Sequence, residues 1–251
     1  MNDMTPSETL LEVRNLSKNF GPVQALNDLS MTVRAGEVVA LAGDNGAGKT
    51  TLIKAISGVY QPSGGEILLK GKPVSFASPQ EARDQGIETI YQDLALADNL
   101  TIGANIFLGR EPMRRAFGFL PVLDRARMAE AAKSTMALLD FHVSRLDAPV
   151  SNFSGGQRQA VAIGRAVYWN AQILIMDEPT AALGVPEQRK VIQLIHQLKA
   201  QGRGVIFISH NLQDIFAVAD RIVVLRRGVQ AGERRIADTT HDEVVKLMVG
   251  G

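Results

Sequence analysis

The stretch Val38-Val39-Ala40-Leu41-Ala42-Gly43-Asp44-Asn45-Gly46-Ala47-Gly48-Lys49-Thr50 decides the fold class of this chain. Residues 43–50 fit G-x-x-x-x-G-K-[ST] at every fixed position, after an apolar run typical of a buried strand and before a helical pattern, Thr51–Ile56. Glycines let the backbone bend so that successive N–H groups point at phosphate oxygens, and the following helix adds the positive end of its dipole. We expect Lys49 to bridge two phosphates of a nucleotide and the Thr50 hydroxyl to bind Mg²⁺. The predicted phosphate-binding residues are Gly43, Asp44, Asn45, Gly46, Ala47, Gly48, Lys49, Thr50 and Thr51.

A second apolar run, Ile173–Met176, ends in the carboxylates Asp177 and Glu178. Open α/β sheets bind ligands at the carboxyl ends of their strands, so these carboxylates are expected beside the phosphate site. We expect Asp177 to hold Mg²⁺ and Glu178 to polarise or deprotonate the water that attacks the γ-phosphate. Another run, Val205–Ser209, delivers His210 to the same edge, where it can orient Glu178 and donate a hydrogen bond to the γ-phosphate.

Composition excludes several other classes of protein. The 251 residues are 45% hydrophobic and 21% charged, which is typical of a folded chain. The absence of cysteine excludes a disulfide framework, a thiolate zinc site and a cysteine nucleophile. The net charge of +1 gives no support for nucleic-acid binding. With no signal-peptide pattern and no apolar run near the roughly 18 residues of a membrane span, we expect a soluble, cytoplasmic protein.

The order of predicted elements indicates one α/β domain over residues 9–251, after a flexible terminus at residues 1–8. Leu11–Val13, Leu29–Val33 and Glu66–Leu69 are expected to form an N-terminal antiparallel β subdomain. The later runs, including Ile222–Leu225, are typical of a mostly parallel sheet, and Pro186–Gln201 has helical periodicity. Residues 94–149 read as helix-rich with no strand signal, so a helical subdomain is predicted at roughly 94–160, inserted in the core.

The stretch Ser154-Gly155-Gly156-Gln157 identifies the family. Ser154 and Gln157 form a capping box that opens a helix running to about Trp169. Two adjacent glycines are unfavourable in a first helical turn, and they expose backbone N–H groups to an anion. With these motifs in this order, nearly the whole chain resembles the ATP-binding subunits of ABC transporters, whose signature reads leucine-serine-glycine-glycine-glutamine. The resemblance implies a P-loop ATPase core that binds ATP and Mg²⁺.

The resemblance also implies roles for individual residues. Phe20 matches the aromatic residue that stacks on adenine, and Gln92 matches the glutamine that reaches Mg²⁺ and the attacking water and links ATP to the membrane partner. The signature Ser154, Gly155, Gly156 and Gln157 would contact the γ-phosphate held by a second protomer in a head-to-tail dimer, and His210 matches the switch histidine.

Two positions depart from the family pattern. Phe153 replaces the usual leucine, and Gly184 replaces an aspartate that helps the two ATP sites sense each other. The glycine puts the strength of that coupling in doubt, and ATP binding is expected to remain.

Three segments resemble bacterial monosaccharide importers of the fructose and ribose type: Asn99–Glu111, Gly58–Pro62 and Tyr91–Leu94. This likeness implies a peripheral subunit on the cytoplasmic face of the inner membrane. It would be held there by a permease and served indirectly by a sugar-binding protein, without nucleic acid.

Two alternatives remain. One is a soluble ABC-type ATPase that acts as a mechanical clamp in DNA repair, chromosome condensation or translation. In DNA-type clamps, a long coiled coil separates the phosphate-binding segment from the signature. In this chain Ser154 follows Lys49 by 105 positions, and the sequence between them has no sustained heptads. The other is a small-molecule kinase, which would leave the signature unexplained.

Overall fold

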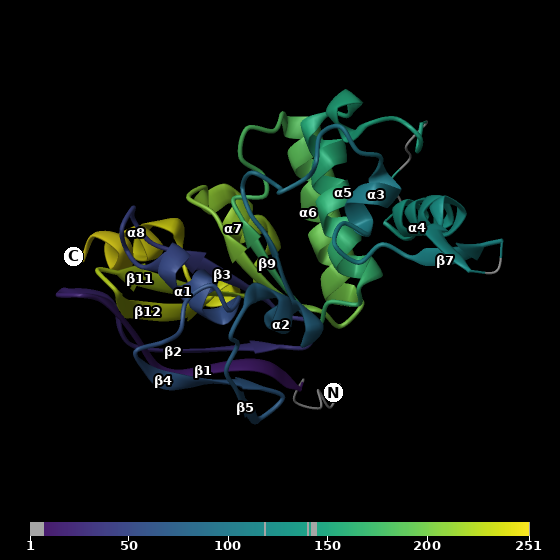
Figure 1. The fold of residues 1–251 in the computed structure, drawn as a ribbon. Helices are drawn as coiled ribbons and strands as arrows, with labels where there is room; N and C mark the ends of the chain where they lie inside the picture. Colours follow the sequence, from purple (N-terminus) through teal and green to yellow (C-terminus); the bar gives the residue numbers. More distant parts are fainter. Residues whose placement is uncertain (1–7, 118, 140, 142–144, 251) are drawn as a thin grey trace.

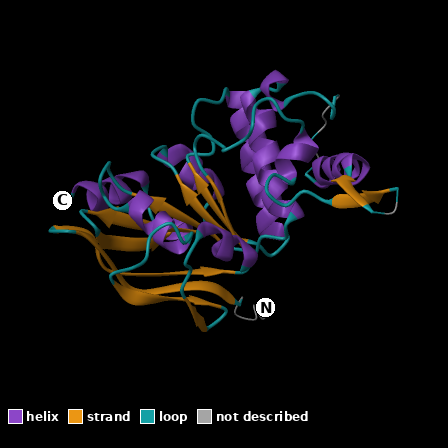
Figure 2. Cartoon of the chain, in the orientation of Figure 1, coloured by secondary structure: helices purple, strands orange, loops and turns teal. Residues whose placement is uncertain are grey.

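The computed structural model describes residues 8–117, 119–139, 141 and 145–250 (Figure 1). The predicted flexible terminus at residues 1–8 lies, apart from Glu8, outside the described residues. Figure 2 shows most strands collected in one part of the molecule and a helical lobe beside them, with one further pair of strands at the edge of that lobe. Within the described ranges, no helix has both the length and the apolar character needed to cross a membrane.

The central sheet has the strand order β12-β11-β3-β10-β9-β6. Its neighbours pair in parallel except β11 and β12, which are antiparallel, so the prediction of a mostly parallel sheet is confirmed. Strands β3 and β10 are buried along their whole length, which is why they read as continuous apolar runs. Strand β6 is equally buried but contains Glu88 and Thr89, so no apolar run marks it in the sequence. The strands are β3 (Val38–Ala42), β6 (Ile87–Ile90), β9 (Ile173–Asp177), β10 (Gly204–Ile208), β11 (Arg221–Arg226) and β12 (Val229–Arg235).

The predicted N-terminal antiparallel subdomain is also confirmed, with the order β2-β1-β4-β5. The side chains of alternate residues in β3 point to opposite faces of the central sheet and belong to two different apolar clusters. Val39 and Leu41 belong to the apolar cluster shared with the antiparallel sheet, and Val38 and Ala40 belong to the cluster shared with the helical side. The antiparallel strands are β1 (Thr9–Phe20), β2 (Val23–Arg34), β4 (Gly64–Leu69) and β5 (Lys72–Val74).

The helices begin and end close to the predicted boundaries. The helix predicted at Pro186–Gln201 spans Val185–Ala200, and the capping box opens a helix at Gly155–Tyr168. Figure 1 shows α3, α4 and α5 grouped in one lobe, with α8 at the opposite end of the molecule. The helices are α1 (Lys49–Ile56), α2 (Pro79–Asp84), α3 (Ile102–Ile106), α4 (Arg125–Leu138), α5 (Gly155–Tyr168), α6 (Val185–Ala200), α7 (Leu212–Val218) and α8 (His241–Val249).

The prediction that no strand interrupts the middle of the chain was wrong. Strands β7 (Met113–Ala116) and β8 (Leu120–Leu123) form an antiparallel hairpin within that segment. Neither strand has a buried face, so their side chains lack the apolar-polar alternation by which a half-buried strand is recognised.

The two sheets are joined by a buried arginine. Arg221, at the start of β11, donates from Nη1 to Glu37 Oε1 at 2.6 Å and from Nη2 to the carbonyl oxygen of Thr32 at 2.6 Å. The guanidinium therefore connects the central sheet to β2 and neutralises a carboxylate that is largely buried.

We expect Arg221→Met to lower the free energy of unfolding by about 3 kcal/mol, because it removes the nearest cation from the largely buried Glu37 carboxylate and leaves it only the more exposed Arg34, at 3.7 Å. Urea unfolding of the full chain measures this change. Arg235→Met, at an exposed position on β12, should unfold close to wild type. Equal midpoints for the two variants would show that the Arg221 pairing does not stabilise the fold.

Candidate active site

A cleft of about 990 Å³ lies at the carboxyl ends of β3, β9 and β10. It brings together the whole predicted phosphate segment, residues 43–51, with Gln92, Asp177, Glu178 and His210. Sequence analysis missed several other residues of its wall. They are Val23, Gln24, Ala25, Ile208, Arg227, Gly228 and Met248. Of these, Arg227 follows β11 directly, so the rule that ligands bind at strand ends could have found it.

The phosphate-binding segment, residues 43–51, is called the cradle below. Two of its positions must be glycine because other residues approach them closely. Gly43 has φ 147°, and a β-carbon there would lie 2.3 Å from the carbonyl oxygen of Leu225. Gly48 has φ 107° and caps the N-terminus of α1, where a β-carbon would lie 2.9 Å from Leu26 Cδ2. Because Gly48 has no side chain to cap the helix, the first N–H groups of α1 are available to an anion.

Lys49 is held by the backbone of the cradle. Its Nζ donates to the carbonyl oxygens of Gly43 and Asp44, the latter at 3.0 Å. Burial lowers the pKa of Lys49, and the nearby carboxylates of Glu178 and Asp177 oppose that shift. The amine therefore lies between the phosphate cradle and the carboxylates of Asp177 and Glu178.

We expect Lys49→Ala to weaken ATP binding by about tenfold to a hundredfold, because it removes charge-assisted hydrogen bonds to phosphate. Titration with a fluorescent ATP analogue measures the affinity. Lys72→Ala, at an exposed position on β5, serves as the matched control and should bind as wild type. Unchanged affinity in the Lys49 variant would contradict the assignment of the cradle.

Glu178 and His210 are in direct contact. Glu178 Oε1 accepts a hydrogen bond from the backbone N–H of His210 at 3.0 Å and lies 2.9 Å from His210 Nδ1. The Glu178 side chain is only 15% exposed, whereas that of His210 is 78% exposed. Glu178 also has φ 52°, a left-handed conformation fixed by its N–H donating to Ile208 O at 2.9 Å. The strained backbone aims this carboxylate at the cleft, and the sequence carried no signal for it.

Asp177 ends β9 beside the cradle, as predicted. Burial raises the pKa of its carboxyl, the charge of Glu178 raises it further, and Lys49 opposes both. A raised folded-state pKa means that Asp177 favours the folded state most when it is protonated. That contribution to stability is lost as the pH rises through the folded-state pKa.

We therefore expect Asp177→Asn to raise the melting temperature of the nucleotide-free chain at pH 7 by about 2 °C or more. The same variant should lose most of its Mg²⁺-dependent gain in ATP affinity. Thermal unfolding at pH 7 and below pH 3.8, the ordinary pKa of an aspartate, separates the two forms. At the lower pH Asp177 is protonated in both the folded and the unfolded chain, so wild type and variant should converge. A variant less stable than wild type at pH 7 would contradict this electrostatic account.

Phe20 does not line the cleft. Its ring packs edge-on against Tyr60, with centroids 5.1 Å apart at 77°, and Lys18 Nζ lies 5.1 Å from its centroid. Val23, which begins the next strand, does reach the cleft wall. Stacking of Phe20 on adenine stays a prediction.

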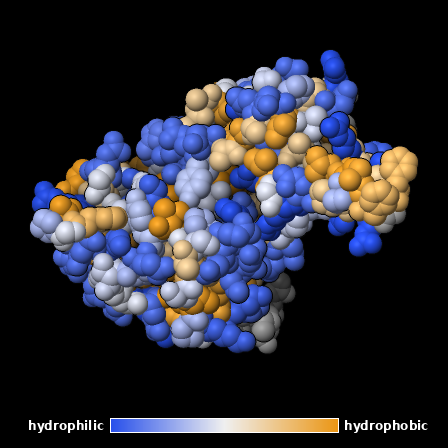
Figure 3. Space-filling view, viewed as in Figure 1, coloured by the Kyte–Doolittle hydropathy of each residue, from blue (hydrophilic) through white to orange (hydrophobic). Residues whose placement is uncertain are grey.

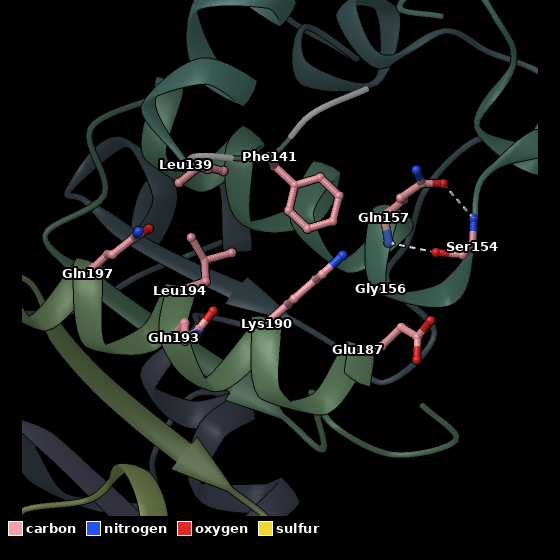
Figure 4. Close-up of a pocket in the computed structure, with 10 residues that line it drawn as sticks. All are labelled: Leu139, Phe141, Ser154, Gly156, Gln157, Glu187, Lys190, Gln193, Leu194 and Gln197. Carbon is pink, nitrogen blue, oxygen red and sulfur yellow. Dashed lines mark hydrogen bonds between the residues drawn. The ribbon is translucent and has the colours of Figure 1, made fainter. Parts of the chain in front are cut away.

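Ser154, Gly156 and Gln157 of the signature line a different pocket, of about 330 Å³, between α5 and α6 (Figure 4). The capping box is confirmed: Gln157 N–H donates to Ser154 Oγ at 3.4 Å, and Ser154 N–H donates to Gln157 Oε1 at 2.9 Å. Among the described residues, none lines both this pocket and the nucleotide cleft. The chain's own signature is thus separated from its own cradle.

The glycines of the signature allow close packing against the start of α6. A β-carbon on Gly155 would lie 2.8 Å from Leu183 Cδ2, and one on Gly156 would lie 2.9 Å from Glu187 Cγ. Glu187 also approaches Gly184, where a β-carbon would lie 2.8 Å from Glu187 Oε2. A carboxylate therefore lies beside Gly184 although the residue itself has none, a placement that sequence analysis missed.

The fold and the cleft define a P-loop nucleotide-binding protein. Residues 26–181 match the model of the ABC transporter family. A xylose/arabinose import ATP-binding protein of Sulfolobus acidocaldarius is 49% identical over 95% of this chain and 93% of its own length. A fructose import ATP-binding protein of Rhizobium meliloti is 44% identical over 97% of this chain and 95% of its own length. The chain belongs to the ABC transporter family, as an ATP-binding and ATP-hydrolysing protein.

Other relatives are longer. A ribose import ATP-binding protein of Chromobacterium violaceum is 45% identical over 95% of this chain, which spans about half (46%) of that relative. Among solved structures, a nucleotide-free ATP-binding cassette of an ABC transporter superposes with a TM-score of 0.80 at 26% identity. That match covers 97% of this chain and 96% of the cassette. The clamp-ATPase alternative is not favoured by these relatives.

Proposed function

We propose that this chain is the ATP-hydrolysing subunit of a monosaccharide importer of the fructose, ribose or xylose type. The observation that carries the proposal is the assembly of cradle, Asp177, Glu178 and His210 in one cleft, with the signature on a separate face. Identities of 44–49% over nearly the whole chain to sugar import ATP-binding proteins support the substrate class.

The donor set of the cleft suits Mg²⁺ bound together with nucleotide. Thr50, Gln92 and Asp177 offer a hydroxyl, an amide oxygen and a carboxylate, which are the hard ligands that Mg²⁺ prefers. In the described part of the chain, no group of three or more His, Cys, Asp or Glu side chains is placed to hold a metal alone. Phosphate oxygens would therefore complete the shell, and the bound ion would neutralise charge on the phosphates.

The residues of the chain then have separate tasks in hydrolysis. The cradle and Lys49 orient the phosphates, and Glu178 accepts the proton of the attacking water. His210 fixes the Glu178 carboxylate from the open side of the cleft through the contacts at 2.9 and 3.0 Å.

A second copy of the chain completes the site in this proposal. The signature of one protomer would meet the γ-phosphate in the cleft of the other, because no described residue of its own pocket reaches its own cleft. ATP would then bridge and close the pair, and hydrolysis would remove the bridge and reopen it. A lone chain would hydrolyse poorly.

A groove of about 210 Å³ beside α2, β6 and α3 is the proposed contact for the permease. Tyr91 lines the groove, and the next residue, Gln92, lines the nucleotide cleft. The groove holds Arg83, Arg110 and Arg165 around the buried Glu88, whose pKa is raised by burial. Arg110 pairs with Asp84 and Arg165 with Glu88, so among the described residues the positive charge of Arg83 is the one that fits a permease segment carrying a carboxylate.

We expect Glu178→Gln to bind ATP within a few-fold of wild type and to hydrolyse it at least about a hundredfold more slowly. The amide keeps an acceptor for the His210 N–H and loses the basicity that takes the proton from water. Nucleotide binding and phosphate release, measured on the same preparation, separate the two effects. Hydrolysis at the wild-type rate would exclude Glu178 as the general base.

The transport assignment is tested with the tagged Glu178→Gln chain, held with ATP and Mg²⁺ in its native host and purified from gently solubilised membranes. A polytopic permease in stoichiometric amount is the expected companion. Uptake of labelled fructose, ribose or xylose should then depend on this chain and fail with Lys49→Ala. Recovery with nucleic acid or ribosomes from the soluble fraction would support a clamp ATPase instead. ATP-dependent uptake of another class of solute would overturn the sugar assignment.

A further inference from the structure

The hairpin of β7 and β8, at the end of the molecule opposite α8, exposes a group of large apolar side chains (Figures 1 and 3). Phe117 and Phe119 in its turn are 90% and 79% exposed, the highest values among the large hydrophobic residues that the structure describes. A cluster of such side chains in water indicates an interaction site. The exposed apolar residues, called the hairpin tip below, are Met113, Phe117, Phe119, Leu120 and Leu123.

The turn departs from ordinary hairpin chemistry at Phe117. This residue has φ 51°, a left-handed conformation that favours glycine, asparagine or aspartate in hairpins. The N–H of Phe119 donates to Ala116 O at 3.3 Å and closes the turn. The exposed Phe117 ring gains no packing in return, and local conflicts of this kind are typical of functional sites.

Positive charge surrounds the hairpin tip. Residues 110–127 contain five arginines and two carboxylates, a net charge of +3 in a chain whose total is +1. Arg110 pairs with Asp84, whereas in the described ranges the other four form no ion pair. These four exposed arginines are Arg114, Arg115, Arg125 and Arg127.

Both carboxylates of the segment are used by the fold. Glu111 Oε1 accepts the N–H of Gly109 at 3.0 Å, and Asp124 Oδ1 caps α4 by accepting the N–H of Arg127 at 3.1 Å. The surface beside the hairpin tip is therefore one of free guanidinium groups, which bind phosphate bidentately.

We propose that the hairpin tip inserts into the headgroup region of an anionic lipid bilayer, with the arginines on lipid phosphates. Aromatic and aliphatic side chains flanked by basic residues are the composition that binds membrane interfaces. A protein-docking surface of ordinary size buries about 800 Å² on each partner, whereas a projecting turn offers a narrow, convex contact. Shape and charge together favour lipid over a protein partner.

This inference is independent of the proposed transport function. The vesicle experiment below requires neither a permease nor hydrolysis, so its failure would leave the sugar-importer proposal untouched. Conversely, a chain that proved to have no permease could still bind lipid through this hairpin.

The test is flotation of the purified full chain with vesicles of phosphatidylcholine alone or with about a third of the lipid as phosphatidylglycerol. We expect binding to the anionic vesicles only, weakened about tenfold when the salt is raised to about 0.5 M. Phe117→Ser combined with Phe119→Ser should weaken binding by about tenfold or more. Arg114→Gln should lower it by about fivefold.

A matched control removes an equally accessible apolar side chain elsewhere in the same lobe. Leu138→Ser, on α4 at 59% exposure, should float as wild type. ATP affinity should be unchanged in the phenylalanine variant, which shows that it is folded.

Three results would overturn the proposal: no binding to anionic vesicles, equal binding to neutral and anionic vesicles, or undiminished binding of the phenylalanine variant. The wild-type chain could also fail to bind vesicles while the phenylalanine variant no longer co-purifies with a permease. In that case the hairpin tip would be a protein contact and the lipid proposal would be wrong.

Discussion

The parallel register of β3, β10 and β9 is the constraint on which the site depends. Ile208 pairs with Leu41 on one side and with Asp177 on the other, so the three strands end at one level. The cradle, the carboxylates and His210 all leave the sheet within two residues of that level. A slip of one residue would turn every side chain of the slipped strand to the opposite face, disturb the packing of both faces and move the residues that follow the strand away from the shared level. The buried core and the catalytic geometry are therefore fixed by the same pairing.

Much of this arrangement could be predicted, for an identifiable reason. Burial on both faces favours apolar residues, so β3, β9, β10 and β11 are visible in the sequence as apolar runs. Strand β6 is buried but contains Glu88 and Thr89, and no such run marks it. The cradle is visible because close approach to Leu225 O and Leu26 requires glycine at fixed positions. The capping box at Ser154 is equally local, since both of its hydrogen bonds lie within four residues.

What could not be predicted depends on exposure, on contacts distant in sequence, or on a neighbour that no motif includes. The hairpin of β7 and β8 has no buried face and hence no period-two pattern. Met248 reaches the cleft only because α8 folds back beside it. Glu187 lies next to Gly184 through helix geometry that a motif comparison of single positions does not register. The left-handed backbone of Glu178 is imposed by its hydrogen bond to Ile208, in another strand.

The adjacency of Tyr91 and Gln92 has a mechanical consequence in the proposed importer. One residue lines the groove and the next lines the cleft, and a planar peptide bond joins them. Displacement of one is therefore transmitted to the other without slack. Leu94 and Ala95 follow with φ values of 57° and 45°, a strained bend directly after this link. A permease segment that displaces Tyr91 in the groove would thus also displace Gln92 in the cleft. The left-handed bend that follows is where the backbone would turn, and the backbone geometry of this short segment would set how far Gln92 moves.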